Sequence, residues 1–522
     1  YCVYKGYCCW TTDCSQAFLN SPTNGKHIYV NPPYGCAPKG IVWKLEKYLY
    51  GLCGAPAAWM NTLATELESL GFKRFEDDPC LLRYIDGKTE IIAEVFVDDV
   101  KWCTNNEDLL KTVIAKIGDK FQITVGTTSV NSENKDRVDF SEAEIDTYLG
   151  LRYRHDRSVD GEHVLKVDQT SYIDKLLERF DLVTQYSAQQ TPFPQCSSTD
   201  ELVKKMGDVE KDDKLKEWAA CYSYPMIIGS LIHAQVHTRP DIGYAVSILS
   251  RSMTNPTLAH YKAARCTLLY LRTTRELGIE YHQKNMLKNE QLVTATTDEQ
   301  YDSHYEAAVD ASFADDRETC RSTSGFVIWF GCSPIDWECK RQPLVTMSTM
   351  ESEYVAASKC VLSIRFLHKF LDFVELKRNG PTRVHEDNAA CIAISDKPVH
   401  RARSKHIGVK YHNVREAVHN GEVKLLPVWT EHQVADIATK QSTKANFIRC
   451  RETLMGRVPF WDLVKNHPKP VDKDVKQYYV ENQRSSWPEV VAPMKQRSYA
   501  WHIMGYESIQ IPGYDEIGYI LN

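Results

Sequence analysis

Two adjacent aspartates, Asp98 and Asp99, lie inside the apolar, β-branched run VFVDDV at residues 95–100. A strand that buries one face gains nothing from two like charges side by side, because each carboxylate makes the other harder to ionise. Such a pair is stable at a solvated turn, which is the usual setting, or where a cation neutralises it. Hard divalent ions prefer carboxylate oxygens, and two of them can hold the reacting groups of a phosphoryl transfer. The pair therefore predicts a turn or one part of a two-metal site.

A third acidic residue, Asp13, lies in the segment TTDCSQAFLN at residues 11–20. This pattern predicts a short strand that ends at Asp13 and runs into a turn, with Phe18 five residues beyond the aspartate. Residues 28–35, IYVNPPYG, are another β-rich run, stopped by two prolines and a glycine.

Glycines and Pro56 predict a loop before a helix over residues 57–70. Gly71 ends that helix, and its apolar stripe fits core packing; the stripe is Trp59, Leu63, Leu67 and Leu70. Residues 77–84 and 90–99 predict two strands joined by a turn at Asp86–Gly87, with the adjacent aspartates at the tip of the hairpin that follows. Further predictions are a helix over 109–122, a polar loop over 127–146, strands near 148–153 and 163–168, and a helix to 180.

The second half of the chain carries more widely spread acids. Residues 306–316, EAAVDASFADD, predict an alternating strand that contains Asp310, and two more strands follow. Ser348 is a plausible cap for a helix that contains both Glu351 and Glu353. Two residues apart, those side chains point about 200° apart, so only one of them can face a given site. A strand that ends in Asp387 leads into a helix, and a last strand, a loop and a helix bearing Asp436 complete the order.

The composition is that of a globular chain, with 43% hydrophobic and 25% charged residues. A length of 522 residues predicts two to four domains. The net charge of −6 argues mildly against a nucleic-acid binder, although local grooves decide such binding. No apolar run approaches the roughly 18 residues that a membrane helix needs. Because the chain begins with Tyr1, we expect a fragment or a processed piece.

The 17 cysteines are scattered and include no CxxC pair, which predicts reduced thiols inside a cell. Four of them cluster near the start of the chain, at Cys2, Cys8, Cys9 and Cys14. Because no histidine lies beside them, the sequence predicts no zinc site there.

The order of these parts resembles the palm of a reverse transcriptase, and the local motifs are similar to those of copia-type LTR retrotransposon Pol polyproteins. The family motifs DVxxAFLNG, YGLKQAPRAW and YVDD resemble residues 13–20, 50–59 and 96–99 here. HTRPDI, at 237–242, is similar to the family's connection between polymerase and nuclease. The family's nuclease motifs DADWAGD, STEAEY, DN and ADILTK resemble residues 310–316, 348–354, 387–388 and 435–440. The likeness spans about residues 10–456.

For the first half, the resemblance implies a polymerase that uses two Mg²⁺ ions, with Mn²⁺ as an alternative. Asp13, Asp98 and Asp99 would be the metal ligands. Phe18 would be the aromatic gate that excludes a ribose 2′-hydroxyl. Gly51, Gly54 and Pro56 would line the template side, where absent side chains allow close approach.

For the second half, the resemblance implies a ribonuclease H-like site that cleaves the RNA strand of a hybrid with two divalent ions. The implied ligands are Asp310, Glu353, Asp387 and Asp436. Glu353 is preferred over Glu351 because the family's EY pair aligns with it. His432 could assist product release, but we expect a solvent-exposed histidine.

Two further segments contain basic residues. A structural role is preferred for the first, and the role of the second remains open. Arg239-Pro240-Asp241 is best interpreted as a helix N-terminus with Asp241 in the first turn. The string KHIGVKYHNVRE at 405–416 is similar to the family's KHIDIRYHFVRE; its basic residues fit either phosphate contacts or a solvated helix face.

The expected fold is therefore α/β (α+β), in four segments. Residues 1–195 would form palm and thumb, 196–299 a linker and helical connection, 300–456 an RNase H-like domain, and 457–522 a tail of unstated role. The implied activity is RNA-directed DNA synthesis with ribonuclease H. The implied partners are an RNA template, a DNA primer, an RNA–DNA hybrid and deoxynucleoside triphosphates, with no membrane. The implied location is intracellular, in a cytoplasmic virus-like particle or the nucleus.

The sequence also departs from the family pattern. Cys53, Gly54 and Ala57 stand where the second motif has Lys, Gln and Arg, which predicts weaker phosphate contacts. Only twelve residues precede Asp13, where the family has a fingers subdomain. We therefore expect nuclease activity with weak DNA synthesis. The alternative is a decayed or domesticated element that binds nucleic acid or a partner without catalysis.

Overall fold

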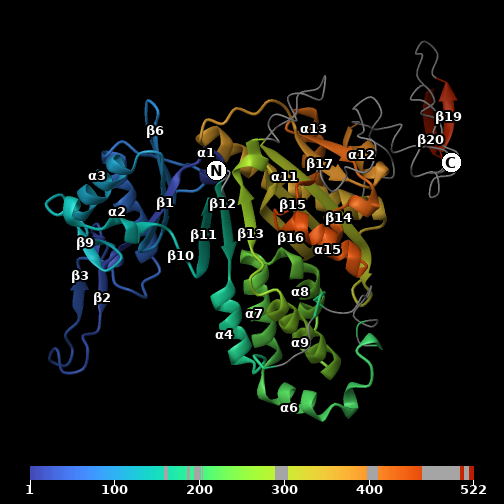
Figure 1. Cartoon of the computed structure of the whole chain (residues 1–522), viewed down its shortest axis with the longest axis horizontal. Coiled ribbons are helices and arrows are strands. Elements are labelled where there is room, and N and C mark those ends of the chain that lie inside the picture. Colours follow the sequence, from blue (N-terminus) through green and yellow to red (C-terminus); the bar gives the residue numbers. More distant parts are fainter. Residues whose placement is uncertain are drawn as a thin grey trace. The chain divides into compact units, whose positions relative to one another are not determined.

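The computed structural model describes residues 1–157, 163–184, 189–192, 202, 204–287, 304–396, 409–460, 506–510 and 517–521. The chain divides into two compact units (Figure 1). Unit 1 comprises Tyr1–Tyr172, Glu280–Lys284 and Phe366–Lys377. Unit 2 comprises Ile173–Ile279, Asn285–Arg365 and Arg378–Asn522. Among the described residues, no helix is both long enough and apolar enough to cross a bilayer.

Unit 1 is built on an antiparallel sheet of seven strands in the order β4-β5-β6-β7-β1-β8-β9. The strands are β1 Cys8–Cys14, β4 Lys73–Arg74, β5 Leu81–Asp86, β6 Thr89–Phe96, β7 Asp99–Thr104, β8 Ile123–Val125 and β9 Thr128–Val130. The central strand β1 separates the β6–β7 hairpin from β8, which places both acid-bearing strands in the middle of the sheet. The predicted turn between β5 and β6 is confirmed, with Gly87 at φ 59°.

Three α-helices and a 3-10 helix complete this part of unit 1: α1 Cys2–Lys5, α2 Ala55–Ser69, α3 Glu107–Gly118 and η1 Ala17–Asn20. Trp59, Leu63 and Leu67 are buried, as the apolar stripe predicts. Helix α2 begins two residues earlier than predicted, because Pro56 is tolerated in a first turn where its missing N–H costs no hydrogen bond. Helix α3 also begins earlier, since Asn106 caps it by accepting a hydrogen bond from the N–H of Leu109.

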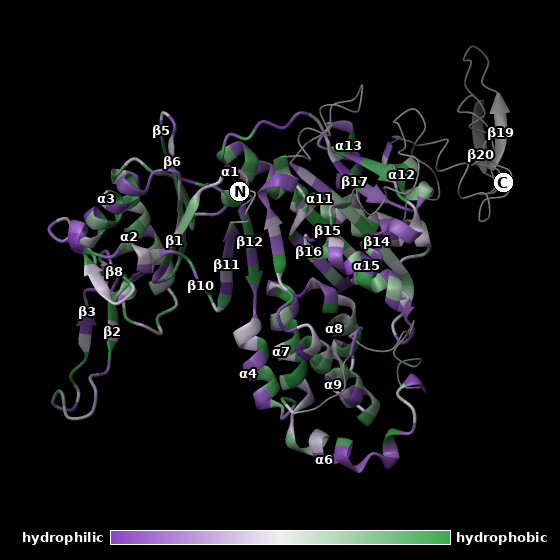
Figure 2. Ribbon diagram, in the orientation of Figure 1, coloured by the Kyte–Doolittle hydropathy of each residue, from purple (hydrophilic) through white to green (hydrophobic). Residues whose placement is uncertain are grey.

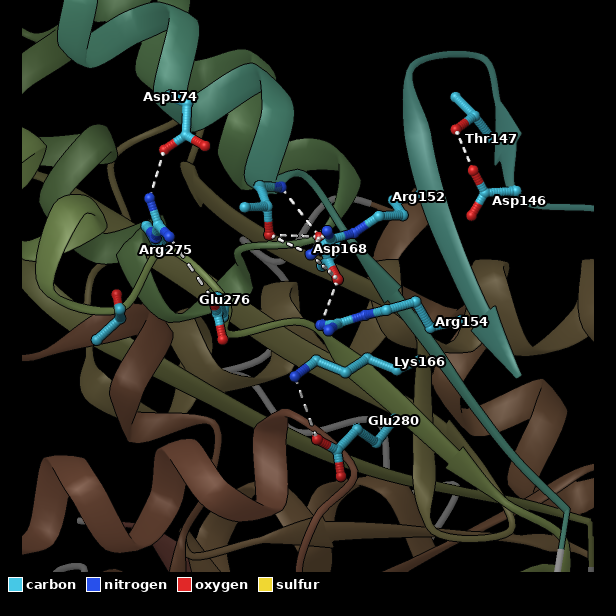
Figure 3. Close-up of polar contacts among 12 residues, drawn as sticks. Asp146, Thr147, Arg152, Arg154, Lys166, Asp168, Asp174, Arg275, Glu276 and Glu280 are labelled. Atoms are coloured by element: carbon cyan, nitrogen blue, oxygen red, sulfur yellow. Dashed lines mark hydrogen bonds and ion pairs between the residues drawn. The ribbon is translucent and has the colours of Figure 1, made fainter. Parts of the chain in front are cut away.

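A second, four-stranded sheet in the order β10-β11-β12-β13 consists of Thr147–Tyr148, Leu151–Arg157, His163–Asp168 and Ile279–His282. Helix α4, Thr170–Arg179, follows β12, so the predicted order of strand, strand and helix is confirmed. Figure 3 shows Arg152 and Arg154 directed at the buried carboxylate of Asp168, which they bind at 3.1 and 2.8 Å. Thr170 also donates to Asp168, so one carboxylate holds β11, β12 and the start of α4 together.

Unit 1 also contains several short elements. Strand β2 Ile28–Val30 lies in the predicted β-rich run at 28–35 and pairs with β3 Trp43–Leu45. The segment at 127–146 was expected to be a loop, but it contains β9 and two 3-10 helices, η2 Lys135–Arg137 and η3 Phe140–Ala143. Polar composition did not reveal these elements, because among their residues with described burial only Val130 and Phe140 are buried.

Unit 2 contains a mixed sheet of five strands in the order β16-β15-β14-β17-β18. The strands are β14 Tyr305–Asp316, β15 Arg321–Phe330, β16 Ser333–Arg341, β17 Thr382–Glu386 and β18 Val423–Pro427. The first three are antiparallel neighbours, whereas β17 and β18 run parallel to β14. This succession matches the predicted one. However, the side chains of β14 do not alternate between buried and exposed, since residues 305–311 are all buried. A central strand with both faces covered excludes water from every side chain.

The helices of unit 2 are α6 Asp213–Cys221, α7 Tyr224–His237, α8 Gly243–Ser250, α9 Leu258–Thr273, α11 Thr349–Phe373, α12 Ala389–Asp396, α13 Asn413–His419, α14 Asp436–Thr439 and α15 Lys444–Leu454. The last residues of the long helix α11 belong to unit 1. Figure 2 shows many hydrophobic residues on α7, α8 and α9. Helix α6 begins inside the segment that was expected to be a linker.

The HTRPDI segment forms the helix N-terminus that the sequence predicts, η5, Pro240–Ile242. The N-cap residue Arg239 makes no side-chain capping bond, and Asp241 lies in the first turn with further partners. It forms a fully buried ion pair with Arg239 at 2.8 Å and accepts a hydrogen bond from the hydroxyl of Tyr270 at 2.6 Å. A buried carboxylate needs such partners, and they bind η5 to α9.

Several expectations fall wholly or partly outside the described residues: the linkers at 197–217 and 288–300, residues 405–408, and most of 457–522. Within the last segment, Tyr506–Gln510 (β19) pairs with Ile517–Leu521 (β20). In the basic string, Arg415 donates to the carbonyl of Ile394, which favours a structural role for that residue.

Candidate metal-binding acid sites

The first acid group lies where β1 meets the β6–β7 hairpin. Asp13 and Asp99 are directly opposite one another in the antiparallel register, which puts their Cα atoms about 4.5–5.5 Å apart. The N–H of Cys14 donates to the carbonyl of Asp98 at 2.7 Å. The structure therefore brings together the three aspartates that the sequence singles out.

The turn that presents Asp98 has a strained backbone. Phe96 and Asp99 are paired, so only Val97 and Asp98 form the turn, and Val97 has φ 56°. A β-branched residue in that left-handed region costs on the order of 1–3 kcal/mol. The indole N–H of Trp59 donates to the carbonyl of Val97 at 2.5 Å, so helix α2 holds the turn in place.

The electrostatics of this group favour a bound cation. Burial, and then the charge of Asp98, raise the pKa of Asp13; burial and both other aspartates raise the pKa of Asp99. The same charges, after burial, raise the pKa of the Cys14 thiol to about 12. Asp13 is exposed and the other two acids are half-buried. Among the described residues, the ligand atoms of these three aspartates do not all lie within 4.8 Å of one another. This group is therefore more open than the acid group of unit 2, which is described below.

The remaining residues that the sequence selects in unit 1 surround η1 and α2, which pack together. Phe18 is buried, with its ring centroid 4.6 Å from that of Tyr50. Gly51 has φ +92° and open space around it. At Gly54 a Cβ would lie 3.2 Å from the ring of Tyr48, which explains glycine there by packing. Pro56 is in the first turn of α2.

The second acid group is assembled from four elements of unit 2. Asp310 lies within β14, Glu353 in α11, Asp387 just after β17, and Asp436 at the start of α14. The ligand oxygens of Asp310, Asp387 and Asp436 all lie within 4.8 Å of one another. Those of Glu353, Glu386 and Asp387 form a second such set. Asp387 belongs to both sets and joins them.

Sequence reasoning missed Glu386, the last residue of β17, which is fully buried. Two neighbouring residues of a strand point to opposite faces, so the strand pattern offers no reason to place both Glu386 and Asp387 in one group. The available signal was the acidic pair itself, two adjacent acids like Asp98 and Asp99.

The structure distinguishes the two glutamates of α11. Glu351 is buried at the helix start, where its carboxylate accepts a hydrogen bond from the N–H of Met347 at 2.6 Å. Ser348 accepts from the N–H of Glu351 at 3.2 Å, so its predicted capping role is confirmed. Glu353 is the residue that joins the acid group.

Burial is the main cause of the electrostatics of this second group. It raises the pKa of Glu353 well above its usual value, and the charges of Glu386, Asp310 and Asp387 add to the effect. Burial likewise raises the pKa of Glu386, Asp387 and Asp436. The Oε2 atoms of Glu353 and Glu386 are buried and have no hydrogen-bond partner.

A lysine partly offsets this negative charge. The ammonium group of Lys440 lies 3.2 Å from Asp310 Oδ1 and 2.9 Å from Asp436 Oδ1. One ammonium cannot neutralise five neighbouring carboxyls. Carboxylate oxygens are hard ligands that suit Mg²⁺ or Mn²⁺ rather than thiophilic metals. The two unpartnered Oε2 atoms fit that donor chemistry.

The expectation for His432 was wrong. It is only 3% exposed, and Arg449 on α15 lies 3.0 Å from its Nδ1. Arg449 also donates to the carbonyl of Glu431, so α15 covers His432, while Thr430 and Glu431 are exposed. The segment before α14 contacts the acid group through Thr430, which donates to Asp387 at 2.9 Å.

Comparison with known proteins shows what the chain is similar to. Residues 2–194 match the family model described as "Reverse transcriptase (RNA-dependent DNA polymerase)". A retrovirus-related Pol polyprotein from transposon TNT 1-94 of Nicotiana tabacum is 29% identical over 84% of this chain and 30% of its own length. The corresponding protein from transposon RE1 of Arabidopsis thaliana is 29% identical over 83% of this chain and 26% of its own length. A putative transposon Ty5-1 protein of Saccharomyces cerevisiae is 29% identical over 67% of this chain and all of its own length. The chain thus spans about 30% or less of the two Pol polyproteins.

Proposed function

Because the chain belongs to the copia-type retrotransposon Pol polyproteins, with residues 2–194 in their reverse transcriptase region, we propose that it carries two separate phosphoryl-transfer sites. One would be an RNA-directed DNA polymerase site in unit 1. The other would be a ribonuclease H site in unit 2. The proposed location is intracellular, in a virus-like particle or the nucleus.

The polymerase proposal rests on the meeting of Asp13, Asp98 and Asp99 at the β1–β7 pair. These aspartates would bind two Mg²⁺ ions, which supply charge stabilisation for the attacking hydroxyl of a primer and the leaving pyrophosphate. The chain itself positions the groups, through the β1–β7 register and the bond from Trp59 to the turn. In this proposal Phe18 selects the sugar of the deoxynucleoside triphosphate, and the segment from Gly51 to Pro56 faces the RNA template.

The nuclease proposal rests on one observation above all, the convergence of five buried or half-buried carboxyls from four elements. The order of three antiparallel strands, a helix and two parallel strands is also that of an RNase H fold. Asp310, Glu353, Asp387 and Asp436 would bind two Mg²⁺ or Mn²⁺ ions, which supply Lewis acidity for hydrolysis of the RNA strand. Glu386 adds a fifth carboxyl, and Lys440 holds the side chains of Asp310 and Asp436 in place.

The test is a hybrid-cleavage assay with a 5′-labelled RNA strand annealed to DNA, in Mg²⁺ and in excess chelator. We expect Asp387→Asn to abolish cleavage without unfolding the chain, because Asp387 contributes to both ligand sets. Asp396→Asn, which changes an exposed acid at the end of α12, is the matched control and should retain parent activity. Cleavage by Asp387→Asn near the parent rate would refute the assignment.

A second candidate function is favoured by the second motif, where both cation positions of the family are lost. Cys53 and Ala57 are exposed and cannot hold a phosphate. A protein that binds the hybrid without synthesis fits this observation. Primer extension on an RNA template separates the two, since robust extension would exclude the binding-only function for unit 1.

A further inference from the structure

Three cysteines from three elements of unit 1 meet in space. Cys2 comes from α1, Cys9 from β1 and Cys103 from β7, and their sulfur atoms all lie within 4.8 Å of one another. The sulfurs of Cys9 and Cys103 are 3.5 Å apart. The sequence predicted no zinc site among the first cysteines, because no histidine lies beside them; the third thiol of this group, Cys103, lies 94 residues beyond Cys9.

The spacing suits a thiolate-bound ion. A tetrahedral Zn²⁺ with Zn–S bonds of about 2.3 Å holds its sulfur ligands about 3.8 Å apart. Cys9 and Cys103 are direct partners in the β1–β7 register, so both side chains project from the same face of the sheet. Cys2 approaches that pair from α1. Three thiolates need no histidine, and a water molecule from solvent can supply the fourth ligand.

The surroundings are largely apolar. Cys9 and Cys103 are buried in a hydrophobic cluster with Ile92, Ile145, Tyr148 and Val374. Cys2 is half-buried, which gives an ion access from solvent.

We propose that Cys2, Cys9 and Cys103 bind one Zn²⁺ ion as a structural site. Binding would deprotonate the thiols that are still protonated and release those protons to solvent, with no change of oxidation state. This proposal is independent of the two proposed activities, because it uses different residues and a different class of metal.

The zinc site would stabilise the pairing of β1 with β7, the two strands that carry Asp13 and Asp99. Cys9 precedes Asp13 by four residues, and Cys103 follows Asp99 by four, so both pairs lie on one face of the sheet, about 13 Å apart along the strands. A slip of one residue between β1 and β7 would turn these side chains to the other face. An ion bound to both strands prevents that slip and ties α1 to them.

The experiment uses Co²⁺ as a spectroscopic substitute for Zn²⁺ on the purified, reduced chain. Excess Mg²⁺ is present so that the hard carboxylate groups are occupied by their preferred ion. We expect one equivalent of Co²⁺ to produce a thiolate-to-cobalt charge-transfer band that one equivalent of Zn²⁺ removes. Cys9→Ser and Cys103→Ser should lose the band, whereas Cys36→Ser, at an exposed cysteine, should keep it.

A second measurement covers the case in which a serine variant fails to fold. In the parent chain, Zn²⁺ should slow alkylation of Cys2 by at least about tenfold, because a metal-bound thiolate is a poor nucleophile. Alkylation of Cys36 and Cys53, both exposed, should not change. A missing charge-transfer band, a band that persists in Cys9→Ser, or equal alkylation of Cys2 with and without Zn²⁺ would overturn the proposal. So would a Cys9–Cys103 disulfide in a zinc-free chain isolated without reductant.

Discussion

Glu353 and Glu386 each carry a buried carboxyl oxygen without a hydrogen-bond partner, which is costly for a folded protein. Proteins retain such groups where a ligand repays the cost. The raised pKa values of Glu353, Glu386 and Asp436 express this cost as a preference for the neutral acid. The site is therefore least stable when it is fully ionised and free of metal.

This preference has a definite pH dependence. As the pH rises above about 4.3, an unfolded glutamate loses its proton while the folded group with the raised pKa retains it. The unfolded state then binds fewer protons, so the free energy of unfolding must fall as the pH rises. We expect the unfolding temperature of the metal-free chain to fall between about pH 5 and 7 through these groups. Thermal unfolding in chelator and in Mg²⁺ checks this, since Mg²⁺ should reduce the fall.

A single substitution should separate stability from activity at this site. Glu353→Gln removes one of the repelling charges, so we expect a gain on the order of 1 kcal/mol in the metal-free chain at pH 7. That gain corresponds to about 2–4 °C in unfolding temperature for a domain of this size. Hybrid cleavage should be lost at the same time. The control is Glu318→Gln, at an exposed acid of unit 2, which should change neither. A destabilised Glu353→Gln chain would show that the repulsion is not the dominant effect.

At the scale of elements, the hydrogen bond from Trp59 to Val97 joins helix α2 to the β6–β7 hairpin. Trp59→Phe removes this bond and leaves the strained turn without its support. We expect primer extension to fall by about tenfold and the free energy of unfolding by only about 1–2 kcal/mol. Trp102→Phe is the matched control, because Trp102 is also fully buried but donates to Thr12 instead. Equal losses of extension in both variants would mean that general core packing, not the turn, matters.

The elements also show how far the sequence alone could lead. The order of strands and helices in both units, and the meeting of Asp13 with Asp98 and Asp99, were expected from motif order and its resemblance to a reverse transcriptase palm. The pairing of β1 with β7, which are far apart in the chain, brings these aspartates together. The alternation expected for β14 failed because period 2 appears only when one face meets water. His432 was misplaced because sequence does not reveal that α15 covers it. Cys103 joined Cys2 and Cys9 through a strand pairing between segments far apart in the chain, which no local pattern encodes.

At the scale of the molecule, the two acid groups belong to different units and share no residue. We expect Asp98→Asn to abolish primer extension and leave hybrid cleavage unchanged. Asp387→Asn should do the reverse. Both reactions are measured in one preparation, with Asp108→Asn, an exposed acid of α3, as the control for unit 1. Loss of both activities in either variant would show that the two sites depend on each other.

The sheet of unit 2 has a consequence for the time course of folding. β14, β15 and β16 pair through short connections, whereas β17 joins β14 only after the 25 residues of α11, and β18 comes later still. Long connections close slowly, so the antiparallel half should form first and the parallel half last. Asp387 and Asp436 therefore meet Asp310 only in the final step. The three carboxylates do not repel one another until the rest of the sheet has formed. In refolding, the fluorescence of Trp329 and Trp337 on β15 and β16 should change in an early phase, and Mg²⁺ should accelerate only a later one.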